Sequence, residues 1–201
     1  MSGLLTRTVI FGLTLNLLVG VAVVWGGPPT EIAKQVIGKA LEILKNPSYQ
    51  GKERRQKAKS IVDPYFDYQE MARRSLGSTW GKLSAGQRNE FVQLFAQLLE
   101  ASYFDKIEKY AQRVKIDYTG EVLEGDYAEV RTMVVRANDR IPLNYRLMQK
   151  NGDWKVYDVV IEGVSLVSNY RSQFSRIILE SSYAELVRRL KTKVSELALA
   201  G

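Results

Sequence analysis

The feature that most constrains this fold is a change in the spacing of apolar residues near position 114. Before this position, apolar side chains recur at the spacing of one helix face; after it, they alternate with polar side chains, as in strands with one covered face. No internal repeat, low-complexity tract or linker separates the two halves. We therefore expect one α+β domain, with helices packed on one face of a curved four-stranded antiparallel sheet that encloses an apolar cavity.

The second half of the chain predicts four strands joined by short turns. The expected strands are 114–118, 128–134, 141–148 and 154–161. Between the last two, Asn151-Gly152 predicts a two-residue hairpin, because a type I′ turn needs positive φ at both central residues. Strands joined in this way form an antiparallel meander.

The fourth strand is apolar on both faces, so its inward side is ambiguous. Tyr157, Val159 and Ile161 make the cleaner apolar face, and we favour these residues as the inward set. The alternative inward set is Trp154, Val156 and Val160.

The helical segments are bounded by capping residues and glycines. A Ser, Thr or Asp followed three residues later by Glu or Gln is typical of a helix N-terminus. Asp67, Ser84 and Ser182 fit this pattern, and Thr30 is the expected N-cap of the first helix. The longest helix is expected to start at Ser84 and to keep one apolar face for several turns. After the last strand, Gly163 turns the chain into another helix.

Residues 1–26 are expected to be a signal peptide, followed by a single domain over 27–201. Arg7 is the only charged side chain in the first segment, and an almost unbroken apolar run follows it. A positive start followed by such a run is typical of secretory signals. The alternative is an uncleaved membrane anchor, but the run is at the short limit for crossing a bilayer. We therefore expect export and cleavage.

Two absent residue types limit the chemistry available to this chain. The sequence contains no cysteine and no histidine. This excludes Ser-His-Asp and Cys-His catalysis and any ordinary zinc site, and leaves only carboxylate, lysine and tyrosine chemistry. We expect no metal ion and no cofactor.

The basic charge balance suits several kinds of anionic partner. The formal net charge is +7, and it becomes +6 if Arg7 is removed with the signal. Anionic lipid surfaces and acidic proteins fit this charge. Nucleic acid is not indicated, because the sequence has no basic stripe interleaved with aromatic residues. The segment containing Lys52, Arg55 and Lys59 is strongly basic, and it is either a solvated helix face or a site for an anionic partner.

Two separated blocks carry a resemblance to a known family. The first is the run D-V-x-x-E-G-V-S-L-x-x-N-Y-R-x-Q-F, from Asp158 to Phe174. The second combines Phe66-Asp67-Tyr68 with Met71-Ala72-Arg73 and Trp80. In order and spacing, these blocks resemble the MlaC family of periplasmic phospholipid carriers, also known as toluene-tolerance proteins.

The resemblance implies a non-enzymatic carrier that moves one phospholipid at a time across the periplasm. The implied partners, besides the phospholipid ligand, are an outer-membrane lipoprotein and porin complex and an inner-membrane ABC transporter with its substrate-binding subunit. It also implies a role in the lipid asymmetry of the outer membrane. We expect a monomer.

A lipid carrier needs a dry cavity for the acyl chains. A diacyl lipid has on the order of thirty methylenes at about 0.8 kcal/mol each, so leaving a quarter of them in water would cost roughly 6 kcal/mol. Two chains call for a volume on the order of 800 Å³. We expect this cavity between the helices and the concave face of the sheet.

The expected lipid-binding residues come from the long helix, the sheet and the helix after Gly163. Those of the long helix are Phe91, Leu94, Phe95 and Leu98. Those of the sheet are Val130, Val134, Leu143, Tyr145, Leu147, Val159 and Ile161. The helix after Gly163 contributes Tyr170 and Phe174. If these residues line an open cavity, tryptophan at Val130 or Leu143 should reduce bound lipid at little cost in stability.

Two other functions fit the same sequence. Small isomerases and dehydratases use an Asp base and Tyr donors in an apolar pocket. The candidates for these roles are Asp158, Tyr145, Tyr157 and Tyr170. Asp158 also has a structural interpretation, in which it accepts hydrogen bonds from backbone amides or from Arg171 after the corner. The second alternative is a membrane-anchored structural or assembly factor.

Overall fold

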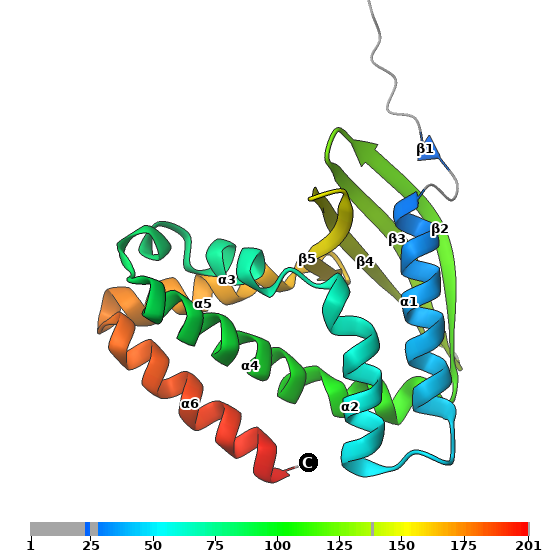
Figure 1. Ribbon diagram of the computed structural model, residues 1–201, viewed down its shortest axis with the longest axis horizontal. Helices are drawn as coiled ribbons and strands as arrows, with labels where there is room; N and C mark the ends of the chain where they lie inside the picture. Colours follow the sequence, from blue (N-terminus) through cyan, green and yellow to red (C-terminus); the bar gives the residue numbers. More distant parts are fainter. Residues whose placement is uncertain (1–22, 25–27, 138, 201) are drawn as a thin grey trace, which may run out of the picture.

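The structure is a computed structural model that describes residues 23–24, 28–137 and 139–200. It has the expected α+β architecture, in which helices lie against a curved antiparallel sheet (Figure 1). The predicted signal peptide, 1–26, lies outside the described residues except for Val23 and Val24. In the part of the chain that is described, no helix is long and apolar enough to cross a bilayer.

The sheet is an antiparallel meander in which each strand pairs with its neighbours in the sequence. Its four long strands are the predicted ones, and a two-residue strand extends the sheet at each edge. The strands are β1 (Val23–Val24), β2 (Val114–Glu124), β3 (Tyr127–Arg136), β4 (Asp139–Lys150), β5 (Asp153–Ile161) and β6 (Val164–Ser165).

The helices precede and follow this meander. The described α-helices are α1 (Pro28–Lys45), α2 (Gly51–Val62), α3 (Tyr68–Leu76), α4 (Ala85–Ala111), α5 (Leu166–Glu180) and α6 (Tyr183–Ala200). Short 3₁₀ helices flank α3 at Asp63–Tyr65 and Gly77–Lys82.

Three predicted N-caps are confirmed. The side-chain oxygens of Asp67, Ser84 and Ser182 each accept a hydrogen bond from the backbone N–H three residues further on. Ser84 and Gln87 make the full reciprocal capping box at the start of α4. These caps place the ends of α3, α4 and α6 where the sequence pattern predicts them.

Thr30 is not the N-cap of α1, because this helix begins earlier, at Pro28. Proline fits a first turn since it has no N–H to leave unpaired. The backbone N–H and the hydroxyl of Thr30 both donate to the buried carboxylate of Glu121 on β2, at 2.8 and 2.6 Å. This carboxylate lies at the positive end of the helix dipole and ties α1 to the sheet.

The predicted hairpin turn between β4 and β5 is confirmed. Asn151 and Gly152 have φ values of 53° and 87°, as a type I′ turn requires. Glu162 and Gly163 form a similar turn after β5, with φ values of 50° and 81°. The chain then makes the short strand β6 and enters α5, whose N-cap is Ser165.

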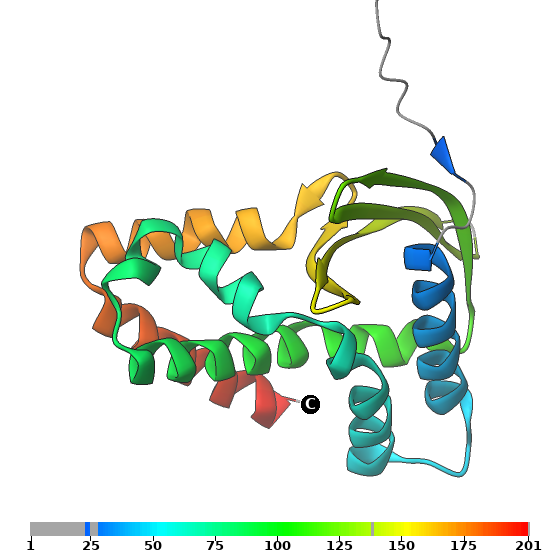
Figure 2. The ribbon, with the colours of Figure 1, turned by 45° about the horizontal axis from the view of Figure 1, so that its top comes forward.

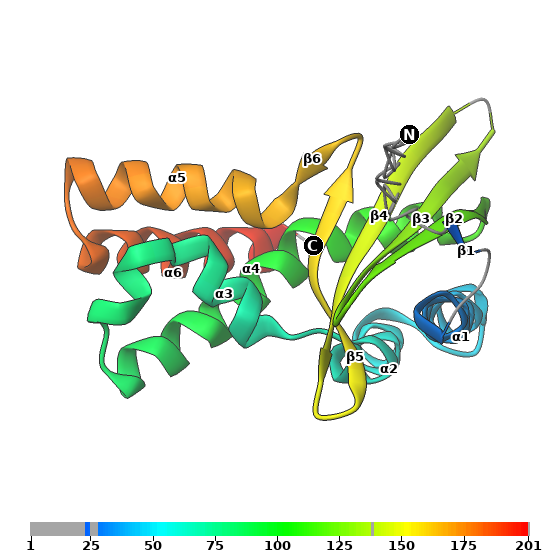
Figure 3. The ribbon, with the colours of Figure 1, turned by 90° about the horizontal axis from the view of Figure 1, so that it is seen from above.

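The helices form two groups on either side of β5 (Figure 3). One group is a bundle of α3, α5, α6 and the N-terminal half of α4, with its own apolar core. The other group is α1, which lies against the concave face of the sheet, and α2, which packs against α1. α4 belongs to both groups, since its 27 residues span about 40 Å. Its C-terminal half crosses beneath the curled sheet (Figure 2).

A β-bulge interrupts the regular alternation of β5. Leu147 pairs with Val156, but the preceding Arg146 pairs with Asp158, so Tyr157 is an extra residue on this strand. An extra residue reverses the face to which the following side chains point. Before the bulge, even-numbered residues of β5 therefore face the cavity side, and after it, odd-numbered residues do.

The bulge joins two residues of each predicted set of β5 into one inward face. The inward residues are Trp154, Val156, Val159 and Ile161. The prediction that Tyr157 faces inward is wrong, because the bulge turns its ring toward the ring of Tyr127, at a centroid distance of 5.9 Å. The guanidinium of Arg74 lies over the same Tyr157 ring, 4.2 Å from its centre. A bulge leaves no mark in a simple alternating pattern.

Asp158 holds the corner between β5 and α5. Its carboxylate is buried and accepts hydrogen bonds from the Val167 N–H (3.1 Å), the Ser165 hydroxyl (2.6 Å) and the Arg146 guanidinium (3.3 Å). The structural interpretation of Asp158, with a backbone amide as donor, is confirmed. The arginine partner is Arg146 of β4 and not the predicted Arg171 of α5.

Replacing Asp158 by asparagine is expected to lower the free energy of unfolding by about 2 to 3 kcal/mol, because charge-assisted hydrogen bonds in a buried site are lost. The measurement is chemical denaturation. Asp153→Asn on the same strand is the matched control, since the Asp153 side chain is 72% exposed and its loss should cost less than about 0.5 kcal/mol. Equal stability of both variants would contradict the structural role.

Candidate functional site

The structure contains an apolar cavity of about 350 Å³ between the helices and the sheet. Its walls are α1, α2, the C-terminal half of α4, and the inward faces of β4 and β5. Leu166 at the start of α5 and Phe66 in the segment before α3 complete the enclosure. Nearly all of the lining side chains are aliphatic or aromatic, so the cavity suits a hydrocarbon ligand.

α1 turns one apolar stripe toward the cavity. The lining residues of this stripe are Ile32, Val36, Ile37, Ala40, Leu41 and Leu44. Their spacing identifies them as one helix face, but sequence reasoning did not assign them to a ligand. The contact between Thr30 and Glu121 holds the N-terminal end of this wall against the sheet.

The predicted sheet residues that line the cavity come from β4 and β5. They are Leu143, Tyr145, Leu147, Val159 and Ile161. Strand pairing brings them together, with Leu143 opposite Ile161 and Tyr145 opposite Val159. Trp154 and Val156 extend the same wall beyond the bulge.

The two predicted residues of β3 lie outside the cavity lining. Val130 is fully buried and packs in a cluster with Ala33 of α1. Val134 is half-buried and pairs with Ile116 and Ile141 in the adjoining part of the sheet. α1 fills the concave face over β3, which leaves the open volume over β4 and β5.

The predicted lipid-binding residues of α4 and α5 lie in the helical bundle. This group is Phe91, Leu94, Phe95, Leu98, Tyr170 and Phe174, and none of them lines the cavity among the described residues. The ring of Phe95 makes edge-to-face contacts with the rings of Tyr170 (5.2 Å) and Phe174 (5.6 Å). These contacts fill the bundle as an ordinary core does.

The later turns of α4 line the cavity instead. Their lining residues are Leu99, Tyr103, Phe104 and Ile107. The same helix face thus packs against the bundle in its first half and faces open volume in its second half. The reason is the length of α4, which extends past the helices of the bundle and under the sheet.

A polar corner lies in the cavity wall between α2 and α4. The Lys59 ammonium is 2.7 Å from the Asp63 carboxylate and 3.4 Å from that of Glu100, and the Tyr68 hydroxyl donates to Asp63 at 2.9 Å. Burial lowers the pKa of Lys59, but the two carboxylates outweigh this effect and raise the pKa overall. One cation therefore faces two carboxylates at this corner.

Tyr145 places a hydroxyl group in an otherwise apolar wall. Burial raises the pKa of Tyr145 well above its ordinary value, so the hydroxyl stays neutral at physiological pH. It is an uncharged donor and acceptor that a bound ester or phosphate group could use.

The structure does not bring together the acid and base groups of the isomerase alternative. Asp158 lies outside the cavity lining and its carboxylate is engaged by three donors. Of the three candidate tyrosines, Tyr145 lines the cavity, whereas Tyr157 and Tyr170 do not. Over residues 28–137 and 139–200, no cluster of acidic side chains is arranged to hold a metal ion.

Comparison with known proteins gives one consistent result. The family model described as "MlaC protein" matches residues 34–192. The intermembrane phospholipid transport system binding protein MlaC of Haemophilus influenzae is 27% identical over 138 residues, a match that covers 66% of this chain and 64% of that protein. A phospholipid-binding protein from Ralstonia solanacearum, solved in complex with a phospholipid, has a similar fold. Its TM-score is 0.77 at 22% identity, over 84% of this chain and 97% of that one.

Proposed function

Because this chain belongs to the MlaC protein family, we propose that it is a carrier that binds a phospholipid by its acyl chains. The observation that carries this proposal is the apolar cavity between α1, α2, α4 and the sheet. The Haemophilus relative is named as a phospholipid transport binding protein, and the Ralstonia structure holds a phospholipid. Both agree with the chemistry of the cavity wall.

The cavity is suited to shielding hydrocarbon from water. Each enclosed methylene contributes about 0.8 kcal/mol, so even a partly enclosed acyl chain gains several kcal/mol over its exposed state. The walls offer few polar groups that would lose hydrogen bonds to water when the tails enter. The phosphate head can remain at the surface, where it keeps its own hydration.

The volume of about 350 Å³ is below the value on the order of 800 Å³ expected for two chains. We therefore expect the lining side chains, or the α1 and α2 wall, to shift outward when a diacyl lipid enters. The expected lipid contacts are the sheet residues Leu143, Tyr145, Leu147, Val159 and Ile161, together with the stripe of α1.

We also propose that the protein works in the periplasm, after export and removal of residues 1–26. Its proposed exchange partners are an outer-membrane lipoprotein and porin complex and an inner-membrane ABC transporter with its substrate-binding subunit. The support for this scheme is family membership and the signal-like N-terminal sequence.

Native mass spectrometry of protein recovered from the periplasm tests both parts of the proposal. We expect a polypeptide mass that lacks the signal peptide, with the added mass of one phospholipid. Organic extraction then identifies the lipid.

The two results are independent of each other. Protein that carries no lipid, and takes up none from mixed phospholipid vesicles, would overturn the carrier function. An intact Met1 on the recovered protein would overturn cleavage and leave the carrier function standing.

A further inference from the structure

The sequence places several basic residues in and just after the last turns of α4, whose C-terminal end lies at the lower right of Figure 1. There, Val114 pairs with Arg136 and Lys115 with Val135, so the start of β2 lies beside the end of β3. The guanidinium of Arg136 lies 3.9 Å from the centre of the Tyr110 ring at the end of α4. We define the basic end as Lys106, Lys109, Arg113, Lys115, Arg136 and Arg140.

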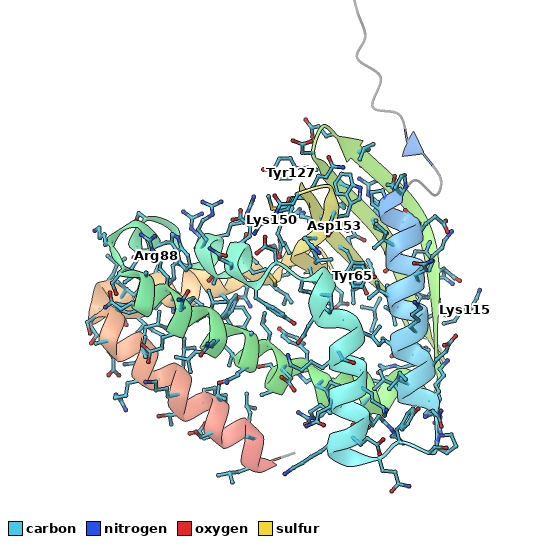
Figure 4. The ribbon with its side chains drawn as sticks, viewed as in Figure 1. Tyr65, Arg88, Lys115, Tyr127, Lys150 and Asp153 are labelled. Carbon is cyan, nitrogen blue, oxygen red and sulfur yellow. The ribbon has the colours of Figure 1, made fainter. Side chains whose placement is uncertain are left out.

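Nearby carboxylates neutralise only two of the six cations of this basic end. Asp105 and Glu108 on α4 pair with arginines of α2. Asp117 pairs with Lys115 at 2.7 Å, and Asp139 pairs with Arg136 at 2.6 Å. The other four cations of the basic end, Lys106, Lys109, Arg113 and Arg140, make no ion pair with any described residue. Positive charge therefore remains in excess at the basic end. Figure 4 shows that Lys115 lies at the outer edge of β2, away from the helical bundle.

The basic segment of α2, which the sequence singles out, has a different role. Its cations Arg54, Arg55 and Lys59 are bound to carboxylates of α4. These ion pairs hold α2 beside α4 along the cavity wall. These three residues therefore form a structural seam between α2 and α4, whereas four cations of the basic end make no ion pair among the described residues.

Exposed apolar side chains lie among these cations. Ile107 is 54% exposed and also lines the cavity, and Tyr110 is 38% exposed beneath Arg136. A residue that borders both the cavity and the solvent marks a place where the cavity approaches the surface. The cavity thus comes close to the surface beside the basic end.

The helix dipole explains only part of this cluster. Lysines in the last turns of a helix offset its negative end, which accounts for Lys106 and Lys109. Arg113, just after the helix, also lies at this negative end, whereas Arg140 lies on β4, beyond the reach of the effect. A surplus of positive charge drawn from α4, the turn after it and β4 indicates a surface built to meet negative charge.

We propose that the basic end docks on an anionic bilayer surface, with the region of Ile107 facing the lipid headgroups. Lysine and arginine around an exposed aliphatic residue and a tyrosine are typical of surfaces that rest at a membrane interface. Cargo that leaves a bilayer also has to meet the cavity near this interface. That last step rests on the proposed carrier function, whereas the charge and exposure of the surface do not.

The strength of this docking follows from the number of cations. Each lysine or arginine close to an anionic membrane contributes about 1 kcal/mol, or roughly a fivefold gain in affinity. The interaction is screened within a distance of about 10 Å at moderate salt, so high salt should release the protein.

Vesicle sedimentation of the mature protein tests this proposal. The probe is vesicles of phosphatidylcholine with about 30% phosphatidylglycerol, which provide a negative surface potential, beside vesicles of phosphatidylcholine alone. The test variant is Lys106→Glu/Arg113→Glu. The matched control is Lys82→Glu/Arg176→Glu, which changes the same charge in the helical bundle at two residues with no ion-pair partner among those described.

We expect binding to the anionic vesicles only, about 25-fold or more weaker in the test variant and within about twofold of wild type in the control. Equal weakening of the two variants would show a mere effect of net charge and overturn the proposal. Absence of vesicle binding by the wild-type protein would also overturn it, and cross-linking of Lys106 to an acidic envelope protein would then assign the surface to that partner. Bound cargo is measured on the same samples, so failure of the carrier function is detected separately.

Discussion

Leu143→Trp is expected to remove most of the bound phospholipid while leaving the protein about as stable as wild type. Leu143 lines the cavity on β4, opposite Ile161 of β5, so an indole there occupies volume that acyl chains would fill. In a packed core, an insertion of this size costs about 1 to 3 kcal/mol. Here the lipid bears that cost, which corresponds to about 5- to 150-fold weaker binding.

Val130→Trp provides the matched contrast on the neighbouring strand. Val130 is fully buried and packs with Ala33 beneath α1, so the indole has no open volume to enter. We expect a loss of about 3 kcal/mol or more in unfolding free energy. This differs from the expectation based on sequence alone, which treats Val130 and Leu143 as equivalent positions on one concave face.

Two measurements on each variant decide the matter: phospholipid per protein after extraction, and the midpoint of thermal unfolding. Leu143→Trp with full lipid content and a marked fall in Tm would place the lipid away from β4. A Val130→Trp protein that keeps its Tm and loses its lipid would move the cavity toward β3.

The elements of this fold could be predicted because their signals are local. The turn at Asn151-Gly152 and the cap at Ser84 depend on residues within one turn of chain, and both are where the pattern predicts them. The prediction that Thr30 is an N-cap is wrong for the complementary reason. Its N–H and hydroxyl are satisfied by Glu121, 91 residues away, and no local pattern encodes such a partner.

The candidate site was only partly predictable, because periodicity identifies an apolar face and not what lies against it. The stripe of α4 from Phe91 to Ile107 is continuous in the sequence, yet it packs in the bundle at Phe95 and borders the cavity at Tyr103. The stripe of α1 from Ile32 to Leu44 carries the same local signal as any core-facing helix. Which stripes border open volume is set by where other helices end, which is a tertiary property.

Phe95→Ala is expected to cause the largest loss of stability of any change considered. The Phe95 ring is completely buried and contacts the rings of Phe91, Tyr170 and Phe174 at centroid distances of 5.2 to 6.0 Å. Removing a ring from such a site costs about 3 to 5 kcal/mol, since the neighbours cannot collapse into the space. For a domain of this size the midpoint of unfolding should fall by roughly 6 to 20 °C.

Phe104→Ala on the same helix separates the two halves of α4. Phe104 is half-buried, lines the cavity, and has the Arg55 guanidinium 4.5 Å from its ring centre. Because its ring already borders open volume, its loss should cost only about 1 to 2 kcal/mol, part of it from the cation–π contact. In the folded fraction of Phe95→Ala, the amount of phospholipid per protein should equal that of wild type. In Phe104→Ala, the amount of phospholipid per protein should differ from that of wild type, because this change enlarges the cavity. If Phe95→Ala left the Tm unchanged and abolished lipid binding, the bundle would be the ligand site, and the division of α4 between core and cavity would be wrong.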